Sequence, residues 1–215
     1  GTPVVVVLVG GSAITMQNWL DRVDAVLDVW YPGEQGGNAV ADVLFGHTDP
    51  AGRLPVTFPV FEGQLPLVYD HEPTGRGDDY VDLTGRPLFP FGFGLSYTSF
   101  AYSALAITPD TIGADGAARV TCRVTNTGAR DGDEVVQLYL HHELSPIARP
   151  VIQLAGFARV HLAPGASRDV SFTLDTAQLA ALDQNMRRTV EPGAYRIMIG
   201  ASSTDIRLRG FLEVR

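Results

Sequence analysis

"AARVTCRVTNTG", residues 117–128, decides the fold class of most of this chain. Val120, Cys122 and Val124 alternate with polar residues, so they fall on one face of an extended strand. The stretch then ends in Asn-Thr-Gly, a combination that is typical of a turn. This pattern predicts a strand with one face buried and the other exposed to water.

The same alternation extends from residue 95 to the C-terminus. In "RDVSFTL", Val170, Phe172 and Leu174 again share one face, and "NTGARDGD" and "APGAS" supply turns between strands. Strand-like runs occur at residues 100–107, 117–128, 133–142, 151–162, 167–174, 193–202 and 207–215. About seven short strands in about 120 residues indicate a two-sheet sandwich of the immunoglobulin or fibronectin type III kind. The chain has one cysteine, which excludes the antibody subclass with its disulfide.

The residue pattern of positions 1–60 is typical of an α/β protein. "TPVVVVLVGG" predicts a buried strand over residues 4–9, because strands that are apolar on both faces belong to parallel sheets. Two more apolar runs, "SAITMQNWL" and "DAVLDVW", give about three candidate strands, and "EQGGNAVADVLFG" gives one helix that ends at Gly46. One helix leaves such a sheet half covered, with an open edge. We therefore expect residues 1–60 to be the C-terminal part of a larger α/β sandwich domain.

Residues 61–94 are expected to form a long loop and linker ahead of the sandwich, which then spans residues 95–215. Glycine, proline and aspartate recur too often in this segment for long helices or strands. Loops longer than about 12–15 residues are usually functional or disordered. The aromatic residues of "PLFPFGFG" favour a segment that packs against the rest of the protein.

Composition excludes some partners. The formal charge of -8 and the pI of about 5.0 argue against nucleic acid, which is bound largely by clustered Lys and Arg. No apolar run reaches the roughly 18 residues of a membrane span. A single cysteine says little about the compartment, so secreted, periplasmic and cytoplasmic locations all stay open.

"WYPGEQGGNAVADVLFG", residues 30–46, looks like a catalytic site because Glu34 stands in a glycine-rich turn. A helix N-terminus, however, favours a charged carboxylate, which suits a residue at the start of a helix and opposes a proton donor. Three glycines could cradle a phosphate or make a tight turn and close helix packing: Gly33, Gly36 and Gly37. The lysine of a P-loop and the spacing of a dinucleotide fingerprint are missing, so no cofactor is expected. Trp30 and Tyr31 could stack on a sugar ring or belong to the core.

The long loop holds the remaining polar candidates. These are Arg76, Asp78, Asp79, Tyr80 and Asp82. Adjacent carboxylates in a loop usually form a solvated turn, but this loop could also lean over a sugar site, with Arg76, Asp79 and Tyr80 in contact with substrate. The five histidines are scattered, and His141 and His142 are adjacent in a strand and point to opposite faces, so no metal site is expected.

The order of the motifs resembles the C-terminal part of family 3 glycoside hydrolases, the β-glucosidase and β-xylosidase group. The motifs are "WYPGEQGGNAVADVLFGHTDPAGRLPVTFP", "RPLFPFGFGLSYTSFAYS", "VTNTGARDGDEVVQLYL", "RPVIQLAGFARVHLAPGASRDVSFTL" and "EPGAYRIMIGAS". Together they cover essentially the whole chain.

The resemblance implies the C-terminal part of a retaining, exo-acting enzyme that hydrolyses terminal β-linked sugars, of the β-glucosidase kind. Retention requires two carboxyl groups about 5–5.5 Å apart. In this family the aspartate nucleophile comes from a barrel and the glutamate acid/base from the upstream α/β domain, so no catalytic residue is expected here and the chain alone is expected to be inactive. The expected partners are a β-linked glycoside and the upstream barrel and α/β portion, in the same polypeptide or as a second chain. The alternative is a non-catalytic carbohydrate-binding or scaffolding module.

Overall fold

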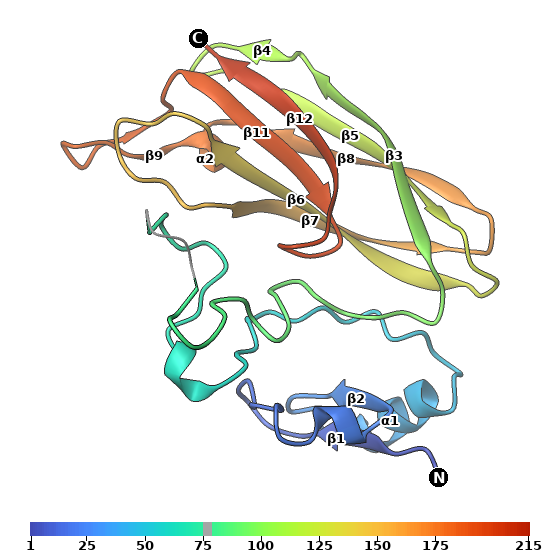
Figure 1. Ribbon diagram of the computed structural model, residues 1–215. Helices are drawn as coiled ribbons and strands as arrows, with labels where there is room; N and C mark the ends of the chain where they lie inside the picture. The colour runs from blue at the N-terminus through green and yellow to red at the C-terminus, as the bar shows by residue number, and fades with distance from the viewer. Residues whose placement is uncertain (75–78) are drawn as a thin grey trace.

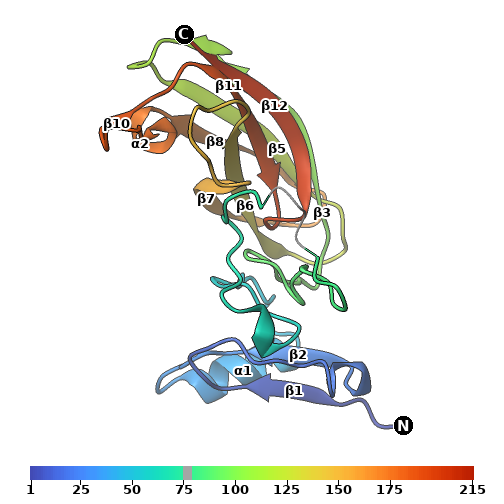
Figure 2. The ribbon, with the colours of Figure 1, turned by 60° about the vertical axis from the view of Figure 1, so that its left-hand side comes forward.

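The computed structural model of the chain describes residues 1–74 and 79–215. A two-sheet β-sandwich forms the C-terminal part, and a small α/β segment lies at the N-terminal end, below it in Figure 1. A long connection, from the end of helix α1 (Gly36–Leu44) to the start of strand β3 (Phe100–Thr108), joins the two parts, as both ribbon views show (Figures 1 and 2). The predicted order, an α/β segment followed by an all-β sandwich, is confirmed. The boundaries at residues 60 and 94 stay a prediction.

The sandwich is built from a sheet with strand order β4-β12-β11-β6-β7 and a sheet with order β3-β5-β8. The strands are β3 (Phe100–Thr108), β4 (Thr111–Ile112), β5 (Ala118–Asn126), β6 (Gly132–His142), β7 (Gln153–Leu162), β8 (Ser167–Leu174), β11 (Gly193–Gly200) and β12 (Ile206–Val214). β4 runs parallel to β12, and the other pairs are antiparallel. Every strand-like run predicted for this region forms a strand, and β4 and a short hairpin described below are additions.

The two sheets meet along the faces that the alternation predicts. Val120, Cys122 and Val124 on β5 are all buried, and Val170 and Leu174 on β8 face the same core. Fully burying a side chain of this size contributes about 1.5–3 kcal/mol. Burial also raises the pKa of the Cys122 thiol to about 11, with a smaller contribution from the negative charge of Asp169. Cys122 is therefore a protonated core residue.

One end of the sandwich carries two small elements. Helix α2 (Thr176–Leu179) begins at Asp175, whose carboxylate accepts a hydrogen bond from the Ala177 amide at 2.8 Å, while Gln178 accepts from the Asp175 amide at 3.1 Å. This reciprocal capping box satisfies two amides that a short helix leaves without partners. Strands β9 (Ala181–Leu182) and β10 (Arg188–Thr189) then form a hairpin.

The α/β segment has two parallel strands, β1 (Val5–Leu8) and β2 (Ala25–Asp28), a short helix η1 (Leu20–Arg22) and helix α1 (Gly36–Leu44). The prediction of about three strands was wrong, because "SAITMQNWL" folds as turns. The amides of Trp19 and Leu20 both donate to the Met16 carbonyl, at 3.0 and 2.9 Å, which curls the chain. Met16 is buried, so its apolar character serves a turn and not a strand.

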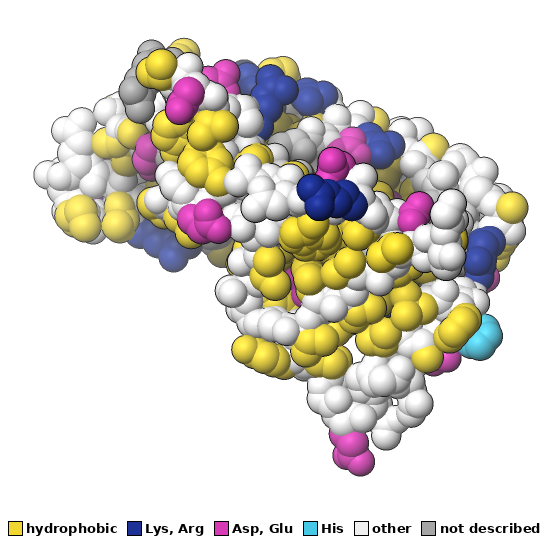
Figure 3. All heavy atoms as spheres, turned by 60° about the horizontal axis from the view of Figure 1, so that its bottom comes forward, with side chains coloured by type: hydrophobic (Ala, Val, Ile, Leu, Met, Phe, Trp, Pro, Cys, Tyr) yellow, Lys and Arg dark blue, Asp and Glu magenta, His cyan; other side chains and the backbone are white. Residues whose placement is uncertain are grey.

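Much apolar surface of this segment faces outward. Val5 is 46% exposed, Val9 65% and Phe45 78%, so the expected burial of the strand is not achieved within the described residues. Figure 3 views the molecule from this side and shows hydrophobic side chains gathered on the surface. Contiguous exposed apolar surface of this kind marks an interaction site.

The connection packs against the outer face of the larger sheet. It contains η2 (Glu62–Gln64) and a β-bridge between Phe58 and Phe89. The rings of Tyr69 and Phe91 stack with their centroids 4.1 Å apart, and the edge of Tyr69 also meets Tyr139 on β6. Aromatic pairs of this geometry add to the stabilisation from burial alone. The connection is therefore held on the sandwich by its aromatic residues.

Candidate functional site

The turn ahead of α1 has the structure of a helix start. Glu34 is exposed and lies two residues before Gly36, the first residue of α1. Gly33 has φ +71°, which favours glycine, and a Cβ on Gly36 would lie 2.6 Å from the ring of Pro32. A tight turn therefore explains Gly33, and close packing explains Gly36, as the structural alternative for this stretch predicts. Gly37 has neither constraint, because a Cβ there would meet nothing within 4 Å.

The two aromatic residues before this turn differ in role. Trp30 is half-buried, and its ring meets the buried Phe58 edge to face at 6.3 Å. Tyr31 is 80% exposed and lies over Gly11, where an added Cβ would come within 2.6 Å of the Tyr31 ring. Trp30 thus belongs to the core of the α/β segment, and Tyr31 has the exposure that stacking on a ligand requires.

The loop candidates are brought together only in part. Asp79 accepts hydrogen bonds from Thr84 Oγ1 at 3.1 Å and from the Gly85 amide at 3.0 Å, and these bonds, the one from Gly85 first, lower the pKa of the Asp79 carboxyl. Tyr80 is 46% exposed and its ring meets the edge of Phe61. Asp79 is therefore ionised and shapes its own loop, while Asp82 is exposed. Arg76 and Asp78 lie outside the described residues.

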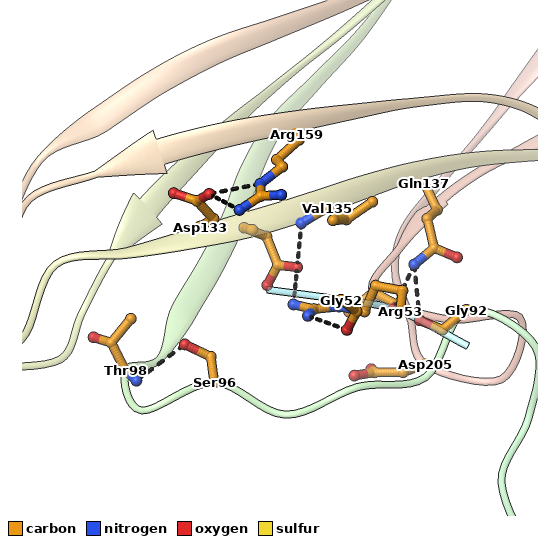
Figure 4. Close-up of polar contacts among 12 residues, drawn as sticks. Gly52, Arg53, Gly92, Ser96, Thr98, Asp133, Val135, Gln137, Arg159 and Asp205 are labelled. Carbon is orange, nitrogen blue, oxygen red and sulfur yellow. Dashed lines mark hydrogen bonds and ion pairs between the residues drawn. The ribbon is translucent and has the colours of Figure 1, made fainter. Parts of the chain in front are cut away.

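A buried ion pair ties the connection to the sandwich. Arg53 Nη2 lies 2.9 Å from Glu134 Oε1 on β6, and the side chains of Arg53 and Glu134 are only 9% and 6% exposed. The close-up in Figure 4 shows Arg53 reaching the strand and Gln137 turned towards Gly92. Gln137 donates through Nε2 to the Gly92 carbonyl at 3.0 Å.

Asp49 supplies a second polar anchor at the same seam. Its Oδ1 accepts from Ser96 Oγ at 2.8 Å and from the Tyr97 amide at 2.7 Å, and its Oδ2 accepts from the Asp133 amide at 3.3 Å. Arg130, in the loop between β5 and β6, donates to the Gly46 carbonyl just after α1. Hydrogen bonds to charged groups contribute about 1.5–3 kcal/mol each, so the α/β segment and sandwich are held in a defined relation.

A second charged cluster lies at the far end of β6. Arg149 Nη2 is 2.6 Å from Glu191 Oε2, and both side chains are 11% exposed. Glu191 also accepts from Ser145 Oγ at 2.7 Å. His142 is 4% exposed, stacks on Tyr195 with the ring centroids 4.3 Å apart, and places Nδ1 3.5 Å from Glu191 Oε2.

This cluster does not form a nucleophilic triad. Nucleophilic catalysis by serine needs a hydrogen bond from the hydroxyl to the imidazole. Ser145 donates to the Glu191 carboxylate instead, and neither ring nitrogen of His142 has a hydrogen-bond partner among the described residues. His142 and Arg149 do line a cleft of 480 Å³ at this end of the sandwich.

Acidification should destabilise the chain through His142. Burial lowers the pKa of its imidazole, the Arg149 charge adds to this, and Glu191 opposes it. The unfolded chain, with a histidine pKa of about 6.5, then binds the proton first, so stability should fall as the pH drops below 6.5 and level off below the folded pKa. We expect His142→Phe to lose less stability than the parent chain between pH 7.5 and 5.5, as measured by urea midpoints. The matched control is His47→Phe, because the His47 side chain is 72% exposed; equal pH dependence in all three proteins would contradict the assignment.

No group of three or more His, Cys, Asp or Glu side chains within residues 1–74 and 79–215 is arranged to hold a metal ion. In that same part of the chain, no helix has the length and apolar character to cross a membrane.

Two family descriptions match this chain. Residues 1–97 match the glycosyl hydrolase family 3 C-terminal domain, and residues 134–203 match the fibronectin type III-like domain. The second match falls within the sandwich, from β6 to the turn after β11.

Proteins of similar sequence and structure are named as β-glycosidases. A periplasmic beta-glucosidase of Salmonella typhimurium is 39% identical, over 98% of this chain and 29% of that protein. A beta-xylosidase of Formosa agariphila is 41% identical, over 94% of this chain and 28% of its own length. The structure of a beta-glucosidase from Listeria innocua in complex with glucose superposes with a TM-score of 0.94 at 31% identity, and covers 100% of this chain and 31% of that one. The chain thus spans less than a third of these proteins.

Proposed function

The chain belongs to glycoside hydrolase family 3, whose C-terminal portion it matches, and we propose that it forms that portion of a retaining, exo-acting β-glycosidase of the β-glucosidase kind. The substrate is a terminal β-linked sugar. The catalytic aspartate and glutamate lie outside these 215 residues. This chain completes the α/β domain and braces it through the sandwich.

One observation carries the proposal: nearly the whole chain aligns with a segment that makes up less than a third of the length of each relative, and these relatives are named beta-glucosidase or beta-xylosidase. The apolar surface around β1 and α1 supports it, because an exposed parallel strand requires a covering partner. Two buried glutamates also support it. Glu134 pairs with Arg53 and Glu191 with Arg149, so neither is free to attack a sugar or to donate a proton.

Hydrolysis of an aryl β-glucoside tests the proposal. We expect no turnover by this chain alone, and turnover when it is joined to the upstream barrel and α/β portion, since retention needs both carboxyl groups. Turnover by the isolated chain would show that its own carboxylates react. Glycan binding by the joined protein without hydrolysis of any aryl β-glycoside would favour a carbohydrate-binding module instead.

We expect the long loop to form one wall of the sugar site. In the joined enzyme, Tyr80→Ala and Arg76→Met should raise KM roughly tenfold with little change in kcat, because a wall residue binds the ground state and the transition state equally. Asp79→Ala should raise KM as well, since Asp79 holds the loop through Thr84 and Gly85. Val81→Ala is the matched control, because Val81 is fully exposed in the same loop. If KM is unchanged in all three variants, the loop is only a solvated turn.

A further inference from the structure

The carboxyl ends of β1 and β2 lie level with each other at one end of the parallel sheet. Leu8 and Asp28, the last residues of the two strands, are paired in register. Beyond them the two loops run side by side, because the Gly10 amide donates to the Trp30 carbonyl at 3.2 Å. Open α/β sheets bind their ligands outside the carboxyl ends of their strands. Residues 9–15 and 29–35, the carboxyl edge, are therefore the part of the α/β segment where a ligand is expected.

Trp30 gives this edge a strained backbone. Its φ is +51°, in the left-handed region that residues other than glycine rarely adopt. The Trp30 amide donates to Asp28 Oδ1 at 3.2 Å, and the Trp30 ring meets the buried Phe58, so the conformation is held from two sides. Backbone strain of this kind is concentrated at functional sites. Here Trp30 packs inward, and Tyr31, the next residue, is left on the surface.

Tyr31 presents an exposed aromatic ring that rests on a glycine. The residue is 80% exposed, and the Cε2, Cζ and Oη atoms of its ring would lie within 3.0 Å of a Cβ added to Gly11. Any side chain at Gly11 would push the ring away, so the glycine lets it lie against the backbone. Tyrosine supplies a rigid contact surface at a low cost in conformational entropy. Its ring is suited to stack on the C–H face of a sugar.

Glu62 brings a carboxylate to the same edge. The residue is exposed in η2, and its Oε1 accepts from Thr15 Oγ1 at 2.8 Å. Figure 2 shows η2 directly above the β1–β2 sheet. A hydrogen bond from its own backbone amide, and after it the bond from Thr15, lower the pKa of the Glu62 carboxyl, which is therefore ionised at neutral pH. A carboxylate has about four acceptor sites, so Glu62 keeps capacity for the hydroxyl groups of a ligand.

The ring and the carboxylate are close enough to meet one small ligand. Tyr31 rests on Gly11 and Glu62 on Thr15, and four residues of chain separate these Cα atoms by at most about 14 Å. Phe61, adjacent to Glu62, meets the ring of Tyr80 edge to face at 6.4 Å. The carboxyl edge is therefore continuous with the loop that we expect to form one wall of the sugar site.

We propose that the carboxyl edge binds the sugar unit on the leaving-group side of the cleaved bond, with Tyr31 on its C–H face and Glu62 accepting from its hydroxyls. The inference rests on the proposed glycosidase function. In a retaining enzyme the terminal sugar stays covalently bound while the leaving group departs, so the site for the leaving group must open to solvent. An exposed edge with one aromatic ring meets that requirement.

Two substrates with the same terminal sugar test this assignment in the joined enzyme. Cellobiose has glucose as its leaving group, whereas methyl β-glucoside has only methanol. Tyr31→Ala should lower kcat/KM for cellobiose roughly tenfold and change kcat/KM for methyl β-glucoside by less than about twofold. Tyr31→Phe keeps the ring and should retain the parent values. Glu62→Gln should lower kcat/KM for cellobiose roughly threefold, because hydrogen bonds to a charged acceptor are about twice as strong.

The control and the outcomes separate this site from a structural role. Phe157→Ala is the matched control, because Phe157 is 67% exposed on β7 of the sandwich, and it should leave both substrates unaffected. Equal losses on the two substrates in Tyr31→Ala would show that Tyr31 only supports the fold, and unchanged values would show that no sugar reaches it; either result overturns the proposal. A joined enzyme that hydrolyses neither substrate overturns the proposed function as well. Hydrolysis of methyl β-glucoside without a selective loss on cellobiose overturns this inference alone.

Discussion

Replacing Arg53 by methionine should lower the free energy of unfolding by about 3 kcal/mol, because the change leaves the Glu134 carboxylate buried without its cation. The side chain of Glu134 is only 6% exposed, so water cannot replace the lost guanidinium. The Val135 amide, which donates to Glu134 Oε1 at 2.7 Å, remains and offsets a part of the cost. Urea unfolding of the chain, followed by circular dichroism, measures the loss.

Two further variants identify the cause. Arg53→Met combined with Glu134→Leu removes both charges, and should recover at least half of the lost stability, because an apolar pair of similar volume is often as stable as a buried ion pair. Arg123→Met breaks the pair with Asp169, whose side chains are 52% and 62% exposed, and should leave the urea midpoint unchanged. A double variant no more stable than Arg53→Met would show that Arg53 acts through packing and not through charge.

The strands of the sandwich could be predicted because their signal is local. Val120, Cys122 and Val124 alternate with polar residues within five positions. Apolar residues at every second position indicate a strand with one buried face. The run "SAITMQNWL" has no such alternation. Its apolar residues predict a strand, but Met16 is buried by a turn, and the hydrogen bonds of that turn depend on the backbone path.

The polar contacts could not be predicted because their partners are far apart in sequence. Arg53 and Glu134 are separated by 81 residues, and Arg149 and Glu191 by 42. Each pair exists only after the connection has packed on β6, or after the β6–β7 loop has met the start of β11. One sequence signal was present, since a lone arginine in the apolar run "AGRLPVTFP" demands a partner when the run is buried.

The same distinction applies to the cleft. From the sequence, His141 and His142 are adjacent in a strand and point to opposite faces, which predicts only that they share no metal ion. The structure buries His142 beside the loop that carries Arg149. No spacing along the chain encodes that proximity.

Gly92→Ala should strongly destabilise the packing of the connection on the sandwich. The backbone of Gly92 has φ +80°, and a Cβ there would lie 2.0 Å from Gln137 Oε1. Gln137 cannot move aside easily, because it is 3% exposed, donates to the carbonyls of Gly92 and Ala201, and accepts from Tyr139 Oη at 2.5 Å. The backbone conformation costs about 1–2 kcal/mol and the overpacking about 1–3 kcal/mol, so we expect a loss of about 3–4 kcal/mol in urea unfolding.

Gly165→Ala separates the two causes. Gly165 has φ +73°, close to that of Gly92, but nothing lies within 4 Å of an added Cβ. This variant should lose only the backbone cost, about 1–2 kcal/mol. Equal losses in the two variants would mean that Gln137 gives way, and that the connection is not held tightly on β6. A larger loss for Gly92→Ala would locate the attachment of the connection at the hydrogen bonds of Gln137, which join it to β6 and to the turn after β11.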